Sequence, residues 1–343
     1  MTVKRIGFAC KWIDNPQQVN GIKATDECKK YNTRSTTVAW LNRQTKDDAV
    51  AKLWELMEYN VESIKLLVEK VGSLNENSRM VRLSSDILPV YTQQDWSWFW
   101  RLPDVRSYLE REFRKVGVMA RTIDVRLSFH PGQFCVLASD NPDIVARSIE
   151  EFEYHVDMVR WMGYGQQFQD FKVNVHISGR QGPAGIRSAL SRLSPEARNT
   201  ITIENDENKW GIEHSLELVN DCALVLDIHH HWAREGEYIQ PTDDRYKRII
   251  DSWRGVRGVI HYSYSRNEHL PVGFDHTSMP DMASLLEAGH KKAKLRAHSD
   301  FYPNRFANDW ALSFWDTADI MAESKAKNLA SAELCTYAIQ QNR

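Results

Sequence analysis

Short runs rich in β-branched and other apolar residues alternate with longer amphipathic stretches along most of the chain. Runs of this kind, bounded by polar or turn-forming residues, are typical of buried strands. They cover residues 3–9, 80–84, 124–129, 172–175, 200–203, 223–226, 258–260 and 319–323. Because strands that alternate with helices form parallel sheets, this series predicts an α/β fold, a closed (β/α)8 barrel of the TIM type.

The amphipathic stretches between these runs predict long helices at 47–71, 96–116 and 142–161, where apolar residues recur at helical spacing. The densest aromatic group of the chain, at 96–100, falls in the second of them. Aromatic side chains in such a group can stack on nucleic-acid bases or pack a helix against the barrel, and the pattern favours packing.

One segment, 264–298, is long for a loop between two barrel strands and has a helical pattern of its own near 282–293. No linker of Pro, Gly or Ser interrupts the alternation elsewhere. We therefore expect a single barrel domain over 1–343, into which 264–298 is inserted. Long insertions at the face where the strands end usually serve function.

Composition restricts the class of protein further. The chain has no apolar run near the roughly 18 residues that a membrane helix needs, and the run at 1–6 leads into a strand without the pattern of a signal peptide. The five cysteines include no CxxC pair, so we expect reduced thiols. These features predict a cytoplasmic protein without a membrane partner, and we expect a monomer.

The formal net charge is −2, which gives no general attraction for a polyanion. A nucleic-acid partner would have to be held by a local basic patch or by bound metal. Composition alone therefore does not indicate a DNA-binding protein.

Imidazole and carboxylate side chains stand at or just past the ends of five successive runs. They are His130, His176, Glu204, Asp227, His230 and His261. Because a barrel brings all its strand ends to one face, we expect these groups to meet and to form a divalent metal centre. Any one histidine alone is more often a hydrogen-bonded core residue, but their repeated placement argues against coincidence.

Within this set, Glu204 is the natural bridge between two metals, because histidines flank it from strands on both sides; an ion pair with a barrel arginine is the alternative. Asp227 and His230, three residues apart at a strand-to-helix junction, can turn toward one ion. The neighbouring His229 and His231 remain ambiguous.

Several segments resemble those of UV damage endonucleases, over most of the chain. The matching segments are RLSFHPGQF at 126–134, RLSSD at 82–86, VHIS at 175–178, IEND at 203–206, Asp227 with His230, His261 with Ser263, AHSD at 297–300 and IMAESK at 320–325. The resemblance implies a barrel of the endonuclease IV and xylose isomerase type. It also implies an enzyme that nicks DNA on the 5′ side of UV photoproducts and other helix-distorting lesions.

The resemblance implies a cluster of two or three divalent ions, commonly Mn²⁺. Its ligands would be His130, His176, Glu204, Asp227, His230, His261, His298 and Glu323. His298 and Glu323 follow from the resemblance alone, and a salt bridge from Glu323 to Lys325 is the alternative. Some relatives have a lysine at the position of Val259 that can be carboxylated and bind metal, and valine cannot ligate. The number of ions therefore stays open.

The family also inserts a polar and an aromatic side chain into damaged DNA, and the matching positions are Gln133 and Phe134. A Pro-Gly turn before them can project this pair, although Phe134 can instead pack under its own loop. Glu204 is expected to be catalytic, and Lys325, together with Arg180 and Arg266, is a candidate for holding phosphates. The expected partner is damaged double-stranded DNA.

Two other functions fit parts of the pattern. A metal-dependent sugar isomerase of the same barrel type would also gather acidic and histidine side chains at strand ends, but it has no use for the Gln133 and Phe134 pair. A damage-binding protein that has lost cleavage would fit Val259 and the absence of a broadly basic composition. A discrete 5′ nick in irradiated DNA separates the endonuclease from both.

Overall fold

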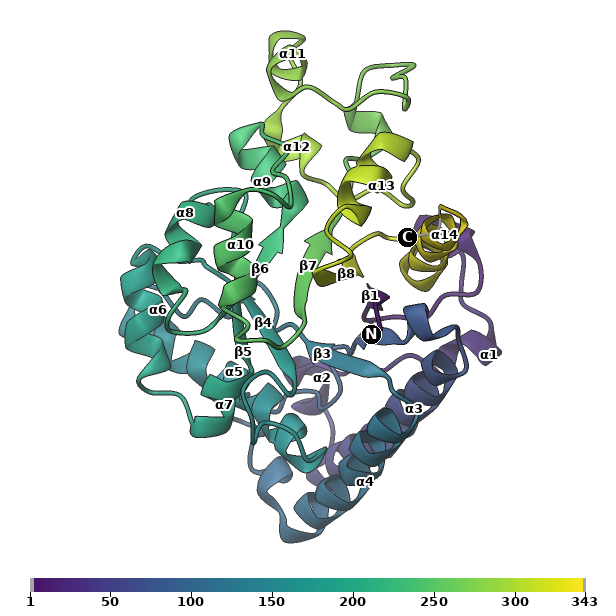
Figure 1. The fold of residues 1–343 in the computed structure, drawn as a ribbon. Coiled ribbons are helices and arrows are strands. Elements are labelled where there is room, and N and C mark those ends of the chain that lie inside the picture. Colours follow the sequence, from purple (N-terminus) through teal and green to yellow (C-terminus); the bar gives the residue numbers. More distant parts are fainter. Residues whose placement is uncertain (1–2, 342–343) are drawn as a thin grey trace.

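A closed barrel of eight parallel strands forms the centre of the computed structural model, which describes residues 3–341 (Figure 1). The strands are β1 (Ile6–Ala9), β2 (Met80–Arg82), β3 (Arg126–Phe129), β4 (Lys172–His176), β5 (Ile201–Glu204), β6 (Ala223–Asp227), β7 (Gly258–Tyr262) and β8 (Ala318–Ala322). Each strand pairs with the next in the chain, and β8 pairs with β1 to close the barrel. The predicted fold class is confirmed, and every predicted run contains one of these strands, whole or in large part. Residues 1–2, which belong to the run that argued against a signal peptide, lie outside the described residues. So do residues 342–343 at the other end of the predicted domain.

Helices surround the barrel. The long ones are α3 (Lys46–Gly72), α4 (Pro103–Thr122) and α5 (Pro142–Trp161). The shorter ones are α1 (Asp26–Lys29), α2 (Val38–Leu41), α6 (Gly182–Leu190), α7 (Pro195–Thr200), α8 (Ile212–Ser215), α9 (Ile228–Glu235), α10 (Asp244–Asp251), α11 (Met282–Glu287), α12 (Lys292–Leu295), α13 (Arg305–Leu312) and α14 (Lys327–Gln340), with 3-10 turns at Pro16–Asn20, Glu76–Ser78, Phe99–Arg101, Leu216–Leu218 and Asn267–His269. Among the described residues, no helix has both the length and the apolarity to cross a membrane.

The second long helix begins later than the sequence pattern predicts. The prediction was 96–116, whereas α4 begins at Pro103. Leu102 has an extended backbone, as expected of a residue before proline, and proline suits the first helical position because it has no N–H to leave unpaired. The aromatic residues ahead of α4 pack instead: Phe99 and Trp100 are buried, which bears out packing as the role of this group.

The two-residue period of the strands decides which side chains point into the barrel. On β4 the inward positions carry Lys172, Asn174 and His176, so polar groups run from one end of this strand to the other. The opposite wall is apolar: Val225 and Val259 belong to a small buried cluster with Ala9, Met80, Ala223, Trp253 and Met321. The interior is therefore polar along β4 and apolar along β6 and β7 below the mouth, while Asp319 on β8 pairs with Arg126 on β3.

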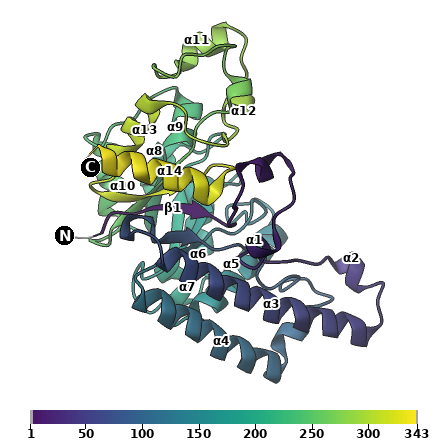
Figure 2. The ribbon, with the colours of Figure 1, turned by 90° about the vertical axis from the view of Figure 1, so that its right-hand side faces the viewer.

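The segment 264–298 lies at the end of β7 and contains α11 and α12. Its two ends are joined by an antiparallel bridge between Ser265 and His298. In both views the segment projects beyond the barrel, with α11 at the far end (Figures 1 and 2). The segment is therefore a hairpin-like insertion, and its two ends are held together at the mouth of the barrel.

Candidate metal centre

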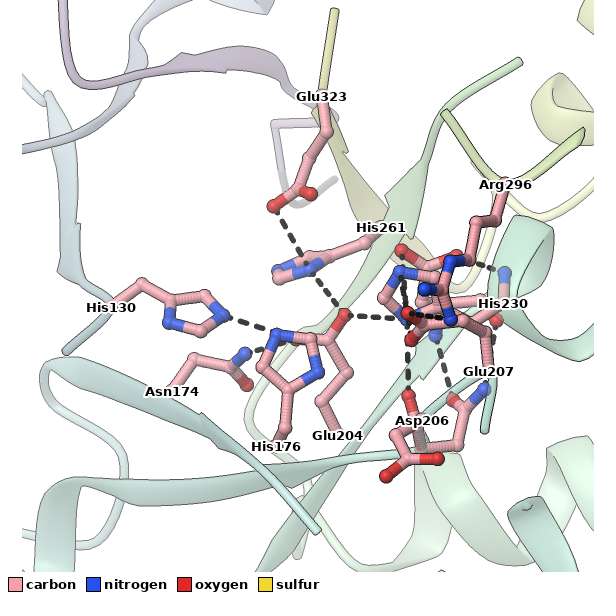
Figure 3. A network of polar contacts seen from close by, with 12 residues as sticks. His130, Asn174, His176, Glu204, Asp206, Glu207, His230, His261, Arg296 and Glu323 are labelled. Atoms are coloured by element: carbon pink, nitrogen blue, oxygen red, sulfur yellow. Dashed lines mark hydrogen bonds and ion pairs between the residues drawn. The ribbon is translucent and has the colours of Figure 1, made fainter. Parts of the chain in front are cut away.

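The six side chains selected from the sequence meet at the mouth where the barrel strands end. Figure 3 labels five of them, His130, His176, Glu204, His230 and His261. His176 on β4 pairs in register with Glu204 on β5, and Asp227 on β6 pairs with His261 on β7. Neighbouring strands thus present these groups at the same height. His130 directly follows β3, and His230 lies in the first turn of α9.

Glu204 lies at the centre of the cluster, and its two carboxylate oxygens face different histidines. Oε2 is 3.4 Å from His130 Nε2 and 3.9 Å from His176 Nε2. Oε1 is 3.1 Å from His261 Nδ1 and 3.5 Å from His230 Nδ1. Each oxygen therefore belongs to a separate set of ligand atoms.

The carboxylate of Glu204 is fully buried, and its charge has to be compensated inside the protein. Burial acts to raise its pKa, but the surrounding imidazoles, His261 and His176 foremost, hold that pKa well below its ordinary value. Asn174 also donates a hydrogen bond to Oε2. Glu204 is therefore an anion at neutral pH.

Asp227 is also fully buried and is less well compensated. Oδ1 accepts a hydrogen bond of 2.7 Å from the backbone N–H of His230, which caps α9, whereas Oδ2 has no hydrogen-bond partner among the described residues. Burial raises the pKa of this carboxyl group well above its ordinary value. His230 Nδ1 lies 3.6 Å from Oδ2, an ion-pair contact when the imidazole is protonated. A buried carboxylate oxygen without a hydrogen-bond donor is where a cation fits.

Two triads at the mouth have ligand atoms close enough to hold metal ions. One consists of His130, His176 and Glu204 and the other of Glu204, Asp227 and His261, with all ligand atoms of a triad within 4.8 Å of one another. Nitrogen and carboxylate oxygen donors suit first-row divalent ions. Because both triads include Glu204, the residues fit a pair of ions that share this carboxylate.

Hydrogen bonds around the triads also orient the imidazoles. His130 Nδ1 lies 2.8 Å from the carbonyl oxygen of Pro131, which can only accept. The ring proton therefore stays on Nδ1, and Nε2 presents a lone pair toward Glu204. Backbone carbonyls fix metal-binding histidines in this way in many proteins.

Glu323, which follows β8, lies beside His261, with its Oε1 3.3 Å from Nδ1. Its ion-pair partner is Arg82 at the end of β2, and the alternative of a salt bridge to Lys325 is wrong. Among the described residues, no hydrogen bond or ion pair is found for the Lys325 ammonium. The charges of Lys327 and Lys172 both interact with Glu323, and burial lowers the pKa of each lysine.

His298 lies at the edge of the cluster and belongs to neither triad. Its ring centroid is 6.4 Å from that of His230. The two ambiguous histidines are both buried: His229 stacks on Trp232, and His231 Nε2 is 3.3 Å from Glu237. His231 is therefore engaged away from the triads, and the ligand role of His298 stays a prediction.

Gln133 and Phe134 occupy the loop after His130. The Phe134 side chain is 85% exposed, so the alternative that it packs under its loop is wrong. Next to it, a largely polar cavity of about 960 Å³ is lined by residues that include Asp86, Arg101 and Arg147. The aromatic ring of Phe134 is thus exposed to solvent on the loop that follows the candidate ligand His130.

Sequence reasoning missed Lys172, the first residue of β4. It is buried inside the barrel with its Nζ 2.9 Å from His261 Nε2, and burial lowers its pKa to about 7. Lys172 precedes Asn174 by two residues and His176 by four, so the two-residue period of a strand places all three side chains on the same inward face. This spacing was the feature of the sequence that could have identified Lys172.

The contact between Lys172 and His261 constrains the imidazole. If His261 binds a cation through Nδ1, its proton is on Nε2 and has to be donated to Lys172. Only an uncharged amine can accept it. The lowered pKa of Lys172 makes this form accessible near neutral pH. Lys172 thus lies where it decides which nitrogen of His261 is free to ligate.

The mouth of this (β/α)8 barrel carries two triads of histidine and carboxylate side chains, and both triads include Glu204. These features place the protein in the class of candidate metal-dependent barrel enzymes. Residues 5–342 match the UV-endonuclease UvdE family. The chain belongs to this family and is an endonuclease of DNA repair. This membership favours the endonuclease over the sugar isomerase and the non-cleaving protein.

Individual relatives agree with the family match. The chain is 27% identical over 267 residues to a UV DNA damage endonuclease of Bacillus velezensis, covering 74% of this chain and 73% of the relative. It is 24% identical over 322 residues to a protein of the same name from Bacillus cereus, covering 90% and 89%. The crystal structure of SacUVDE matches with a TM-score of 0.69 at 18% identity over 99% of both chains. Endonuclease IV from Thermus thermophilus matches with a TM-score of 0.52 at 13% identity, over 81% of this chain and 94% of that one. These two structures share the fold.

Binding of a divalent ion to the metal-free protein is expected to release a proton from His230. Burial lowers the pKa of this residue, but Asp227, Glu204 and Glu207 outweigh burial and raise it to about 9. Below that pH a metal ion competes with the proton, so affinity should rise up to about tenfold per pH unit between 7 and 9 and then level off. Calorimetric titration in two buffers of different ionisation enthalpy measures the released protons. His230→Asn should release about one proton fewer, and equal release by both proteins would contradict this prediction.

Lys172→Met is expected to weaken metal binding about 10- to 100-fold, because His261 loses the partner that fixes its ring. The melting temperature of the metal-free protein should not fall, since the substitution also removes a buried ammonium group. Metal titration and thermal unfolding in chelator measure the two effects. Lys247→Met, at an exposed lysine on α10, is the matched control. A lower melting temperature with unchanged metal affinity would show that Lys172 only fills space.

Proposed function

We propose that this endonuclease depends on divalent metal, Mn²⁺ in particular, and hydrolyses double-stranded DNA on the 5′ side of UV photoproducts and other helix-distorting lesions. The names of its relatives support DNA carrying UV damage as the substrate. We further propose that the protein acts as a monomer in the cytoplasm, with a single barrel domain.

The observation that carries the proposal is the position of Glu204 between two triads of ligand atoms. A carboxylate shared by two ions holds them close together, as hydrolysis of a phosphodiester by two metals requires. Oδ2 of Asp227, which has no hydrogen-bond partner among the described residues, supports a cation in the second triad. When bound, divalent ions polarise the phosphodiester and neutralise the charge that develops on its oxygens.

The side chains around the triads hold the ligands in place. Arg82 pairs with Glu323 and keeps that carboxylate beside His261, while Asn174 holds Oε2 of Glu204. Thr202 in turn donates a hydrogen bond of 2.7 Å to Asn174 Oδ1, so the amide nitrogen of Asn174 faces Glu204. In this proposal His298 and Glu323 complete the ligand set, and Lys325 contacts a phosphate beside the cleaved bond.

Recognition of the lesion is proposed to rest on Gln133 and Phe134. Stacking of a base on an aromatic ring is worth about 1–3 kcal/mol, whereas separating a step of intact duplex costs a few kcal/mol, and less where a lesion has already weakened it. An exposed ring can therefore enter damaged DNA at little net cost and is excluded from intact DNA. The 85% exposure of Phe134 fits this role.

Glu204→Gln is expected to lower the nicking rate about 1000-fold or more, because the neutral amide cannot bridge two cations. Binding of the damaged duplex should change little, since Glu204 is buried below the surface that DNA would contact. A Mn²⁺-dependent nicking assay on an irradiated oligonucleotide, with a parallel binding assay, measures both. Glu213→Gln, at an exposed carboxylate on α8, is the control. Full activity of Glu204→Gln would disprove the bridge.

Phe134→Ala is expected to reduce the preference for damaged over intact duplex by about 5- to 150-fold, the range that corresponds to the loss of one stacked base. Phe134→Tyr keeps the ring and should keep the preference. Equilibrium binding to matched irradiated and intact duplexes measures the ratio. If the alanine and tyrosine variants discriminate equally, Phe134 does not contact the lesion.

A further inference from the structure

A basic run without any carboxylate occupies residues 290–296, inside the segment 264–298. It contains Lys291, Lys292, Lys294 and Arg296, in a chain whose formal net charge is −2. The three lysines are exposed. Among the described residues none of these lysines forms an ion pair; Lys292 Nζ donates to the backbone oxygen of Arg234 at 2.7 Å. Their charges are therefore available to a partner.

The basic run is held firmly at its base. Leu295 of α12 is fully buried, and its carbonyl oxygen accepts a hydrogen bond of 2.5 Å from Ser265 Oγ. Arg266 N–H donates to the carbonyl oxygen of Ala297 at 3.1 Å, next to the bridge between Ser265 and His298. An ordered base means that the backbone carrying the lysines need not become ordered when they bind.

The last residue of the basic run, Arg296, lies next to the candidate metal centre. Arg296 lies 3.3 Å from Glu207, whose other oxygen is 3.8 Å from His230 Nε2 (Figure 3). The carboxylate of Glu207 thus uses the charge of Arg296 and leaves the three lysines as the unpaired cations. From there the chain runs outward through α12 to α11, away from the barrel (Figure 2).

The distance over which the lysines act is limited by the chain. Lys291 precedes His298 by about seven residues, so their Cα atoms are at most about 25 Å apart. One turn of B-DNA is about 34 Å long. Any DNA backbone contacted by the lysines therefore lies within about one helical turn of His298 at the edge of the cluster.

We propose that Lys291, Lys292 and Lys294 form a contact surface for the sugar-phosphate backbone of the duplex that flanks the cleaved bond. This inference rests on the proposed function, because it takes DNA to be the occupant of the mouth. Ammonium groups on flexible stems bind phosphates as point charges without reading sequence. The surface therefore supplies affinity, while Phe134 supplies discrimination.

The test compares the full-length protein with a triple variant, Lys291→Gln, Lys292→Gln and Lys294→Gln. Removal of each lysine that binds a phosphate should lower the slope of log affinity against log salt by about 0.9, so the triple variant should have a slope smaller by about 2.7. Affinity for duplex DNA at about 0.1 M salt should fall at least tenfold, and equally for irradiated and intact duplexes. The single-turnover nicking rate at saturating protein should not change, because these lysines do not touch the cleaved bond.

A control variant with the same change in charge carries Arg114→Gln, Arg192→Gln and Lys247→Gln, at exposed positions on or beside the outer helices. It should keep the wild-type salt slope. If the variant of the basic run also keeps the wild-type salt slope, while the wild-type protein nicks irradiated DNA, the basic run does not contact DNA and the proposed function stands. If the wild-type protein fails to nick, the proposed function itself is wrong. Equal melting temperatures of the three proteins confirm that the variants fold.

Discussion

A fully buried carboxylate at the mouth of the barrel is the constraint around which the rest of the site is arranged. An isolated anion in a protein interior costs several kcal/mol, and Glu204 avoids this cost only because four imidazoles, an amide and a lysine surround it. Lys172, Asn174 and His176 come from β4, and the other three groups come from the end of β3, from β7 and from α9. The charge of Glu204 is thus compensated before any cation is bound, whereas Asp227 keeps one oxygen without a hydrogen-bond donor, where a cation would add compensation.

The barrel satisfies this constraint through the alternation of its strands. Inward positions on β4 and β5 carry the polar groups, and those on β6 and β7 carry Val225 and Val259 below Asp227 and His261. Hydrophobic contacts therefore fix one wall, while hydrogen bonds fix the other. Parallel pairing in register keeps both walls at the same height, which is why ligands from neighbouring strands meet at the mouth.

The sequence was sufficient to predict the barrel, its eight strands and the convergence of six side chains, because β-branched runs and strand ends are local signals. It was insufficient where the decisive interaction is between distant segments. Arg82 pairs with Glu323 across 241 positions, and Lys172 reaches His261 through the barrel interior. The start of α4 was misplaced because helical spacing extends over the aromatic group before Pro103, and the proline decides the boundary. His298 and Glu323 were identified as candidates from family resemblance: His298 lies outside every predicted strand, and the run 319–323 that ends at Glu323 gave no sign of its own that this carboxylate faces the mouth.

The pairing of Arg82 with Glu323 has a consequence for how the protein is made. Glu323 is supplied by the last barrel strand, and β8 has to close on β1 before this carboxylate can reach its partner. A ribosome therefore has to release nearly the whole polypeptide before Arg82 and Glu323 can meet beside His261. A chain that ended before β8 would leave Arg82 without this carboxylate and the barrel open between β7 and β1.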